Sequence, residues 1–132
     1  MIKETEKWSN SIWIGVKDND FDEYLNQDKY GKSCGFCQDI GQGYDVDNIC
    51  IYVSKNIIPI EKLVEEVPFS ECFENEIIKR CHAMGLIEGN ALISLLDEEF
   101  DFSTDKIFSG LRFVGVFECW FSDEYLKRCG LA

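Results

Sequence analysis

The clearest strand signal in the sequence is residues 11–16, Ser11-Ile12-Trp13-Ile14-Gly15-Val16. Branched residues at positions 12, 14 and 16 alternate with Trp13 and Gly15, which is the alternation of a β-strand. The residues that follow predict a helix, because Asp20 can cap it and Glu23 stands three positions later. The first part of the chain is therefore expected to form a strand and then a helix.

The middle of the chain predicts a second strand and an amphipathic helix. Residues 31–48 are glycine-rich and irregular, with a short helical turn expected around residues 36–40. The strand is Ile49-Cys50-Ile51-Tyr52-Val53, which is rich in branched residues. Pro59 then begins a helix that Pro68 ends. Its apolar stripe follows the i, i+3, i+4, i+7 spacing of a helix face and consists of Ile60, Leu63, Val64 and Val67.

The last part predicts one more helix and two closing strands. Ser70 is expected to cap a helix that continues to about Met84, with Gly85 after its end. Residues 91–96 are almost wholly apolar, as in a strand buried on both faces, and residues 111–117 form another strand. We expect these two strands to pair as a hairpin, and a short C-terminal helix to start at Ser122.

These elements together predict an α+β fold. The expected order is β-α-β-α-α-β-β with the short C-terminal helix, in a single domain covering residues 1–132. The simplest arrangement is a largely antiparallel four-stranded sheet with helices packed mainly on one side.

The charge balance limits the partners that the protein can bind. The sequence contains 13 basic and 25 acidic residues, a net charge of −12. Such a chain repels phosphate backbones and anionic membranes, and it favours a positively charged protein partner. The alternative is that the charge only keeps the protein soluble. Residues 1–7 lack the apolar segment of a signal peptide, and no apolar run is long enough for a membrane span, so we expect a cytoplasmic protein.

The cysteines raise the question of redox or metal chemistry. Cys34-Gly35-Phe36-Cys37 is a C-x-x-C pair, which can form a redox dithiol or supply two zinc ligands. No convincing strand precedes it and no second pair follows. His82 is the only histidine, and it lies beside Lys79 and Arg80 on a predicted helix surface. We therefore expect no catalytic residue, no metal and no cofactor. A thiol-redox or zinc-dependent protein that uses Cys34 and Cys37 is the alternative.

Two acidic segments are the richest candidates for a binding site. The first lies in the glycine-rich loop and the second follows the strand at 91–96. The residues are, in the first segment, Asp39, Tyr44, Asp45 and Asp47, and in the second, Glu98, Glu99 and Asp101. Carboxylates around an aromatic anchor suit a partner that carries Lys and Arg. The same residues can also be a solvated loop whose aspartates cap turns, and the sequence leaves both interpretations open.

Several of these segments, taken in order, resemble the immunity protein 22 family, whose members accompany bacterial polymorphic toxins. The resemblance covers roughly residues 11–120. The segments that carry it are Ser11-Ile12-Trp13-Ile14-Gly15 with Phe21-Asp22-Glu23-Tyr24-Leu25, the series Phe36, Asp39, Gly41, Tyr44, Asp45 and Asp47, the segment Pro68-Phe69-Ser70-Glu71-Cys72-Phe73, and the closing strands at 90–96 and 111–116. Val46 and Asn48 depart from the family's pattern, because a histidine and an aromatic residue are usual there.

The resemblance implies a non-catalytic inhibitor of a cognate toxin. Toxins of such systems are often nucleases, and a nuclease needs a basic cleft to attract phosphate. An acidic inhibitor can occupy that cleft, so the expected partner is a basic toxin domain rather than nucleic acid or membrane. The expected contact residues are the two acidic segments.

Overall fold

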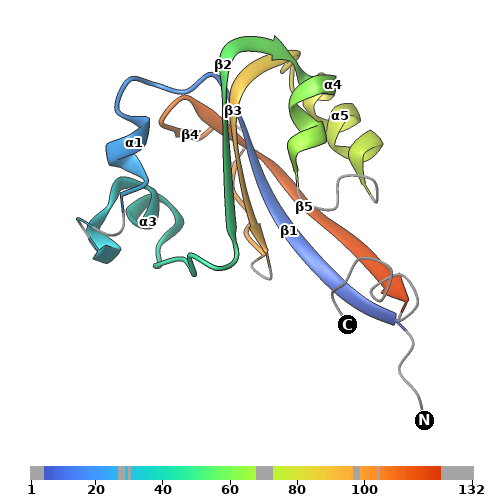
Figure 1. Cartoon of the computed structure of the whole chain (residues 1–132), viewed down its shortest axis with the longest axis horizontal. Coiled ribbons are helices and arrows are strands. Elements are labelled where there is room, and N and C mark those ends of the chain that lie inside the picture. The colour runs from blue at the N-terminus through green and yellow to red at the C-terminus, as the bar shows by residue number, and fades with distance from the viewer. Residues whose placement is uncertain are drawn as a thin grey trace.

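In the part of the chain that the computed structural model describes, five antiparallel strands form one curled sheet (Figure 1). The structure describes residues 5–26, 29, 31–67, 73–96, 99–103 and 105–122. The strands are β1 (Thr5–Gly15), β2 (Ile49–Pro59), β3 (Glu88–Leu96), β4 (Ile107–Phe108) and β5 (Leu111–Ser122). Their order across the sheet is β2-β3-β1-β5-β4. The first strand of the sequence is thus the middle strand of the sheet, and β2 lies at one edge.

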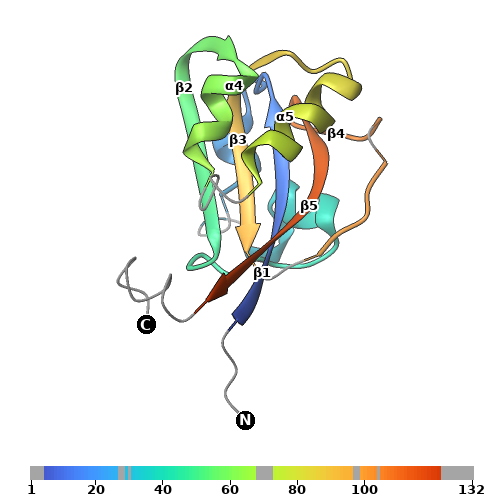
Figure 2. The same cartoon turned by 90° about the vertical axis from the view of Figure 1, so that its right-hand side faces the viewer.

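Helical segments cover both faces of this sheet, as Figures 1 and 2 show. On one face lie α1 (Phe21–Tyr24), the 3-10 turn η1 (Gly31–Ser33) and α3 (Gly35–Ile40). On the other lie α4 (Ile60–Leu63), the 3-10 turn η2 (Val64–Glu66) and α5 (Glu74–Ala83). The expected apolar stripe of α4 and η2 is confirmed, because Ile60, Leu63, Val64 and Val67 are all buried.

Three sequence-based expectations about the sheet are wrong. The sheet has five strands and not four, since the two-residue β4 is too short to produce a periodic signal. Residues 91–96 and 111–117 do not form a hairpin, because β1 lies between β3 and β5 and pairs with both. The helices lie on both faces and not mainly on one. The helix expected to start after Ser70 begins instead at Glu74, with Phe73 as its N-cap. Ser70 itself and the expected C-terminal helix, apart from its first residue Ser122, fall outside the described residues.

The residues of β1 explain why both faces need a cover. Ile12 and Ile14 point to the α4–α5 face, where they join one buried cluster with Leu92 and Ile77. Trp13 points to the opposite face and belongs to a second cluster. Both faces of the central strand are apolar, so each gains free energy only when helices exclude water from it.

Trp13 is the centre of the second cluster and is fully buried. Its ring lies 5.2 Å from the ring of Phe36 on α3 and 5.2 Å from that of Phe113 on β5, both edge to face. Phe100 and Phe102, from the segment after β3, lie 5.8 Å and 6.5 Å away. Each such pair contributes about 0.5–1.5 kcal/mol beyond its buried area. These contacts hold α3 and the segment at 99–103 against the same face of the sheet.

A bulge bends β5 where it crosses β1. Ile12 pairs with Gly115 and Trp13 pairs with Phe113, so Val114 is the extra residue. The Val114 carbonyl accepts a hydrogen bond of 3.2 Å from the Arg80 guanidinium of α5. The carbonyl that the bulge removes from the strand ladder is therefore bonded by a side chain of α5.

Candidate functional site

The first acidic segment begins on α3, which its own sequence anchors to the sheet. Phe36, Cys37 and Ile40 are the buried residues of this helix. Cys34 is its N-cap, and its sulfur accepts a hydrogen bond of 3.4 Å from the Cys37 backbone N–H. Gly41 ends the helix in the left-handed conformation, with φ of 83°. The chain then turns toward β2.

Asp39 is occupied by contacts within the protein. Its carboxylate accepts a hydrogen bond of 2.5 Å from the Tyr24 hydroxyl, which joins α1 to α3. Its backbone carbonyl accepts one of 2.7 Å from the Lys106 ammonium. Burial, and then the hydrogen bond to Asp39, raise the pKa of Tyr24 well above its usual value. Asp39 therefore stabilises the fold beside the candidate site.

Tyr44 is also held inside the molecule. Its hydroxyl donates a hydrogen bond of 2.6 Å to the Leu25 carbonyl, and its ring lies 5.8 Å from that of Phe36. The side chain is only partly exposed. It supports the loop before β2, and its role as an aromatic anchor for a partner stays a prediction.

Asp45 and Asp47 form a turn whose side chains face solvent. The Asp45 carboxylate accepts a hydrogen bond of 2.9 Å from the Asp47 N–H, and the Asp45 carbonyl accepts one of 2.9 Å from the Asn48 N–H. Both aspartates are exposed, and Val46 between them is 61% exposed. A second oxygen of the Asp45 carboxylate and both oxygens of Asp47 thus have room for a partner.

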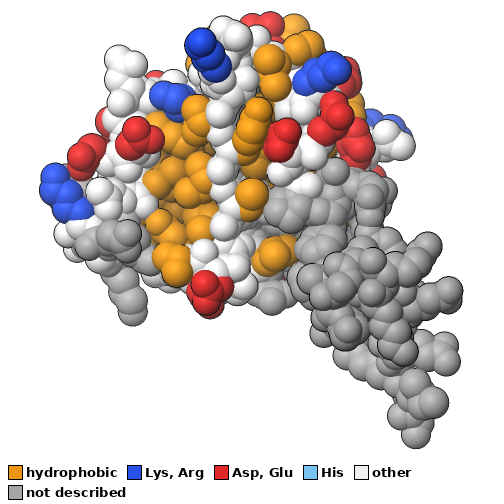
Figure 3. All heavy atoms as spheres, viewed as in Figure 1, with side chains coloured by type: hydrophobic (Ala, Val, Ile, Leu, Met, Phe, Trp, Pro, Cys, Tyr) orange, Lys and Arg blue, Asp and Glu red, His pale blue; other side chains and the backbone are white. Residues whose placement is uncertain are grey.

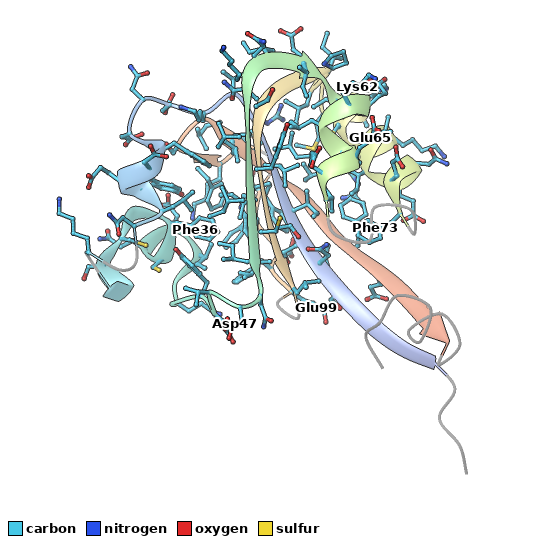
Figure 4. All side chains as sticks on the ribbon, viewed as in Figure 1. Phe36, Asp47, Lys62, Glu65, Phe73 and Glu99 are labelled. Atoms are coloured by element: carbon cyan, nitrogen blue, oxygen red, sulfur yellow. The ribbon has the colours of Figure 1, made fainter. Side chains whose placement is uncertain are left out.

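Strand pairing brings part of the second acidic segment close to the turn of Asp45 and Asp47. The Leu96 N–H donates a hydrogen bond of 2.9 Å to the Asn48 carbonyl, so the end of β3 lies beside the start of β2. Glu99, which is exposed, follows β3, and Figure 4 shows Asp47 and Glu99 at the same end of the sheet. We call Asp45, Asp47 and Glu99 the acidic end.

The rest of the second segment has a different role. Phe100 and Phe102 pack against Trp13, so this segment is attached to the core. Asp101 is exposed and lines a hollow of about 360 Å³ with Arg80 of α5 and the β5 bulge. Asp101 thus belongs to another part of the surface, and Glu98 lies outside the described residues.

A strip of apolar side chains on β2 was missed by sequence reasoning. Ile49, Ile51 and Val53 lie opposite Leu95, Ile93 and Ala91 of β3, on the face that carries Trp13. Ile51 is 40% exposed and Val53 is 41% exposed. Figure 3 shows apolar side chains gathered between β2 and the α1–α3 side of the molecule, with acidic side chains around them. We call Ile49, Ile51 and Val53 the β2 strip.

The described cysteines and His82 have surroundings that fit a structural role. The Sγ atoms of Cys34 and Cys37 lie 3.1 Å apart, and both residues are 1% exposed, out of reach of an exchange partner. Burial raises the pKa of Cys81 to about 12. His82 Nε2 lies 3.3 Å from the Glu61 carboxylate on the surface. The described residues contain no group of three His, Cys, Asp or Glu side chains that could hold a metal ion.

The ordered segments noted in the sequence have a counterpart among known families. A family model described as Immunity protein 22 matches residues 11–119. The chain belongs to the immunity protein 22 family. The match to immunity protein 22 contains the whole of β2, β3 and β4, so the acidic end and the β2 strip lie within it. Membership supports an immunity function and implies a cognate toxin as the partner.

The other comparisons do not extend this assignment. Neither a curated protein nor a solved structure matches this immunity protein 22 chain. Within the described residues, no helix combines the length and the apolar character that crossing a membrane requires. The assignment therefore rests on the family match, and the binding surface has to be argued from the geometry.

Proposed function

We propose that this protein neutralises a cognate bacterial toxin by binding it in the cytoplasm through the acidic end. The observation that carries the proposal is the Immunity protein 22 match over residues 11–119. The protein acts as a binding protein and makes or breaks no bond of its own. The toxin presents a basic surface there, as the cleft of a nuclease does.

Charge and geometry support this surface. The net charge of −12 produces a negative field that speeds the approach of a basic partner. Asp45, Asp47 and Glu99 are exposed and lie where β2 begins and β3 ends. Carboxylates at this end take the place of the phosphates that a nuclease cleft attracts. Asp101 supplies a second contact to the toxin, at the hollow that it lines with Arg80 and the β5 bulge.

The proposal sets a scale for the complex. A specific interface buries about 1,600 Å² in total. Protection against a lethal enzyme requires nanomolar or tighter binding, which is about −12 kcal/mol. Co-expression with the toxin domain encoded beside this gene should abolish toxicity, and the two proteins should elute together on gel filtration. Persistent toxicity without a complex would refute the function.

Charge reversal tests the surface itself. Asp45→Lys with Asp47→Lys should slow association at low salt by about tenfold or more, because the local field is inverted. The difference should shrink toward about 1 M salt, where charges are screened within about 3 Å. The matched control is Asp18→Lys with Asp22→Lys, which makes the same change in charge on exposed residues that follow the C-terminal end of β1, away from the acidic end. Equal rates for the two double variants would remove the acidic end from the proposal.

A further inference from the structure

β2 has an outer edge that no strand of the described structure covers. It is the last strand of the sheet, paired with β3 on one side only. The Leu96 N–H to Asn48 carbonyl bond fixes which residues face β3. Backbone groups alternate between the two edges of a strand, so Ile49, Ile51 and Val53 direct their N–H and C=O groups outward. Their side chains are also the β2 strip.

Only the first half of this edge is open to pairing. The register shifts between Val53 and Ile58, and the segment between them contains Lys55, while Pro59 ends the strand. Bulges, lysine and proline are the features by which edge strands avoid pairing with other chains. Residues 49–53 contain neither a charge nor a proline. They form an open edge of about 17 Å, at about 3.3 Å per residue.

The opposite side of the sheet is less suitable. There the two-residue β4 is the edge strand and covers only the start of β5, and beyond it β5 carries the bulge at Val114, whose carbonyl is already bonded to Arg80. A strand added to β5 would have to displace this contact. The start of β2 carries no such bond from a helix among the described residues, and it continues directly from the turn of Asp45 and Asp47.

We propose that an extended segment of the toxin adds to the outer edge of β2 at Ile49, Ile51 and Val53, with a basic residue of that segment against Asp45 and Asp47. This inference rests on the proposed function and names how the partner binds. The backbone of the added strand supplies the hydrogen bonds, and its apolar side chains cover the β2 strip.

Charge identifies the occupant. The carboxylates of Asp45 and Asp47 are exposed at the start of the open edge, so a cationic side chain at that end of the segment is favoured. A second copy of this chain is disfavoured, because each copy carries a net charge of −12 and would bring a further Asp45 and Asp47 to the pairing edge.

Two replacements of Ile51 distinguish the contribution of its backbone N–H to toxin binding from that of its side chain. Ile51→Pro removes an outward N–H that β3 does not use, so an edge strand tolerates it. It should weaken binding to the neighbouring toxin domain by about a hundredfold, since a partner carbonyl loses its donor inside the interface. Ile51→Thr keeps the N–H and the strand preference, and should weaken binding by about tenfold through lost apolar contact. Ile107→Thr, at an isoleucine that is 55% exposed on β4, is the matched control and should bind like wild type.

Hydrogen exchange gives a direct view of the added strand. The amides of Ile51 and Val53 should exchange rapidly in the free protein and become protected in the complex, because only a new strand supplies their acceptors. Unchanged exchange at these amides, or wild-type affinity in folded Ile51→Thr and Ile51→Pro, would overturn strand addition and leave the toxin-binding function standing.

The remaining outcomes are also distinct. If wild-type protein fails to bind the toxin domain at all, the proposed function is wrong and this inference with it. If gel filtration shows a dimer of wild-type protein that Ile51→Pro converts to a monomer, the edge is occupied by a second copy, and the assignment of the toxin to it is overturned.

Discussion

Replacing Tyr24 with phenylalanine should remove the hydrogen bond that joins α1 to α3. The Tyr24 hydroxyl donates its 2.5 Å hydrogen bond to the Asp39 carboxylate, and the side chain is partly buried. A hydrogen bond to a charged group contributes about 1.5–3 kcal/mol, and partial exposure places this one near the lower limit. We therefore expect wild type to be more stable than Tyr24→Phe by about 1.5 kcal/mol at pH 7.

The same contact predicts a loss of this advantage in alkali. Burial and Asp39 raise the pKa of Tyr24 in the folded state, whereas in the unfolded chain it titrates near the ordinary tyrosine value of 10.0. Above pH 10 the unfolded state releases a proton that the folded state keeps, so unfolding becomes more favourable as the pH rises. The wild-type advantage should fall by about 1.4 kcal/mol per pH unit and be nearly gone by about pH 11.

Denaturant unfolding at pH 7, 9, 10 and 11 measures both effects as a difference between the two proteins. Cys81, whose pKa is about 12, is present in both and cancels in that difference. Asp39→Asn is the companion variant: it should lose the stability that the hydrogen bond supplies at pH 7, whereas burial, the largest cause, still raises the pKa of Tyr24 and keeps the loss of stability in alkali. A stability difference that is constant with pH, or absent at pH 7, would refute the reasoning and return Asp39 to the candidate contact residues.

Two other predictions concern packing and the cysteine pair. Gly15→Ala should destabilise the protein by about 3 kcal/mol, because the new Cβ would lie 2.6 Å from the Gly110 carbonyl oxygen. The control, Gly41→Ala, meets no atom within 4 Å and should cost about 1 kcal/mol for its positive φ. Equal shifts in denaturant midpoint for the two variants would contradict this prediction. Cys34→Ala with Cys37→Ala should leave toxin affinity unchanged, and elemental analysis of wild type should find no stoichiometric zinc; loss of binding or of a bound metal would favour a thiol or zinc function.

Local sequence signals predicted the elements that are periodic and apolar. The alternation at 11–16 correctly indicates a strand, and the stripe of Ile60, Leu63, Val64 and Val67 correctly indicates a buried helical face. The apolar run at 91–96 is a strand buried on both faces, as expected. These signals succeed because a residue's period along the chain directly reflects which side of an element it occupies.

The candidate site was predictable only in part. Asp45 and Asp47 are exposed as a binding loop requires, but Asp39 and Tyr44 bond to Tyr24 and Leu25, residues that precede them by 15 and 19 positions. No local sequence pattern distinguishes a carboxylate that faces solvent from one that accepts a hydrogen bond from a partly buried hydroxyl. The exposure of Ile51 could not be predicted either, since Ile49-Cys50-Ile51-Tyr52-Val53 has the composition of a central strand.

The sequence by itself determined the family, the acidic charge and the identity of most strands and helices, because these follow from residue order and short-range periodicity. Tertiary structure decided that β1 separates β3 from β5, that β2 is an edge strand, and that Asp47 and Glu99 lie at the same end of the sheet. The physical reason is that the order of the strands depends on which side chains, far apart in the sequence, can bury one another. Trp13 on one face and Ile12 on the other make β1 the strand that gains most from the centre of the sheet.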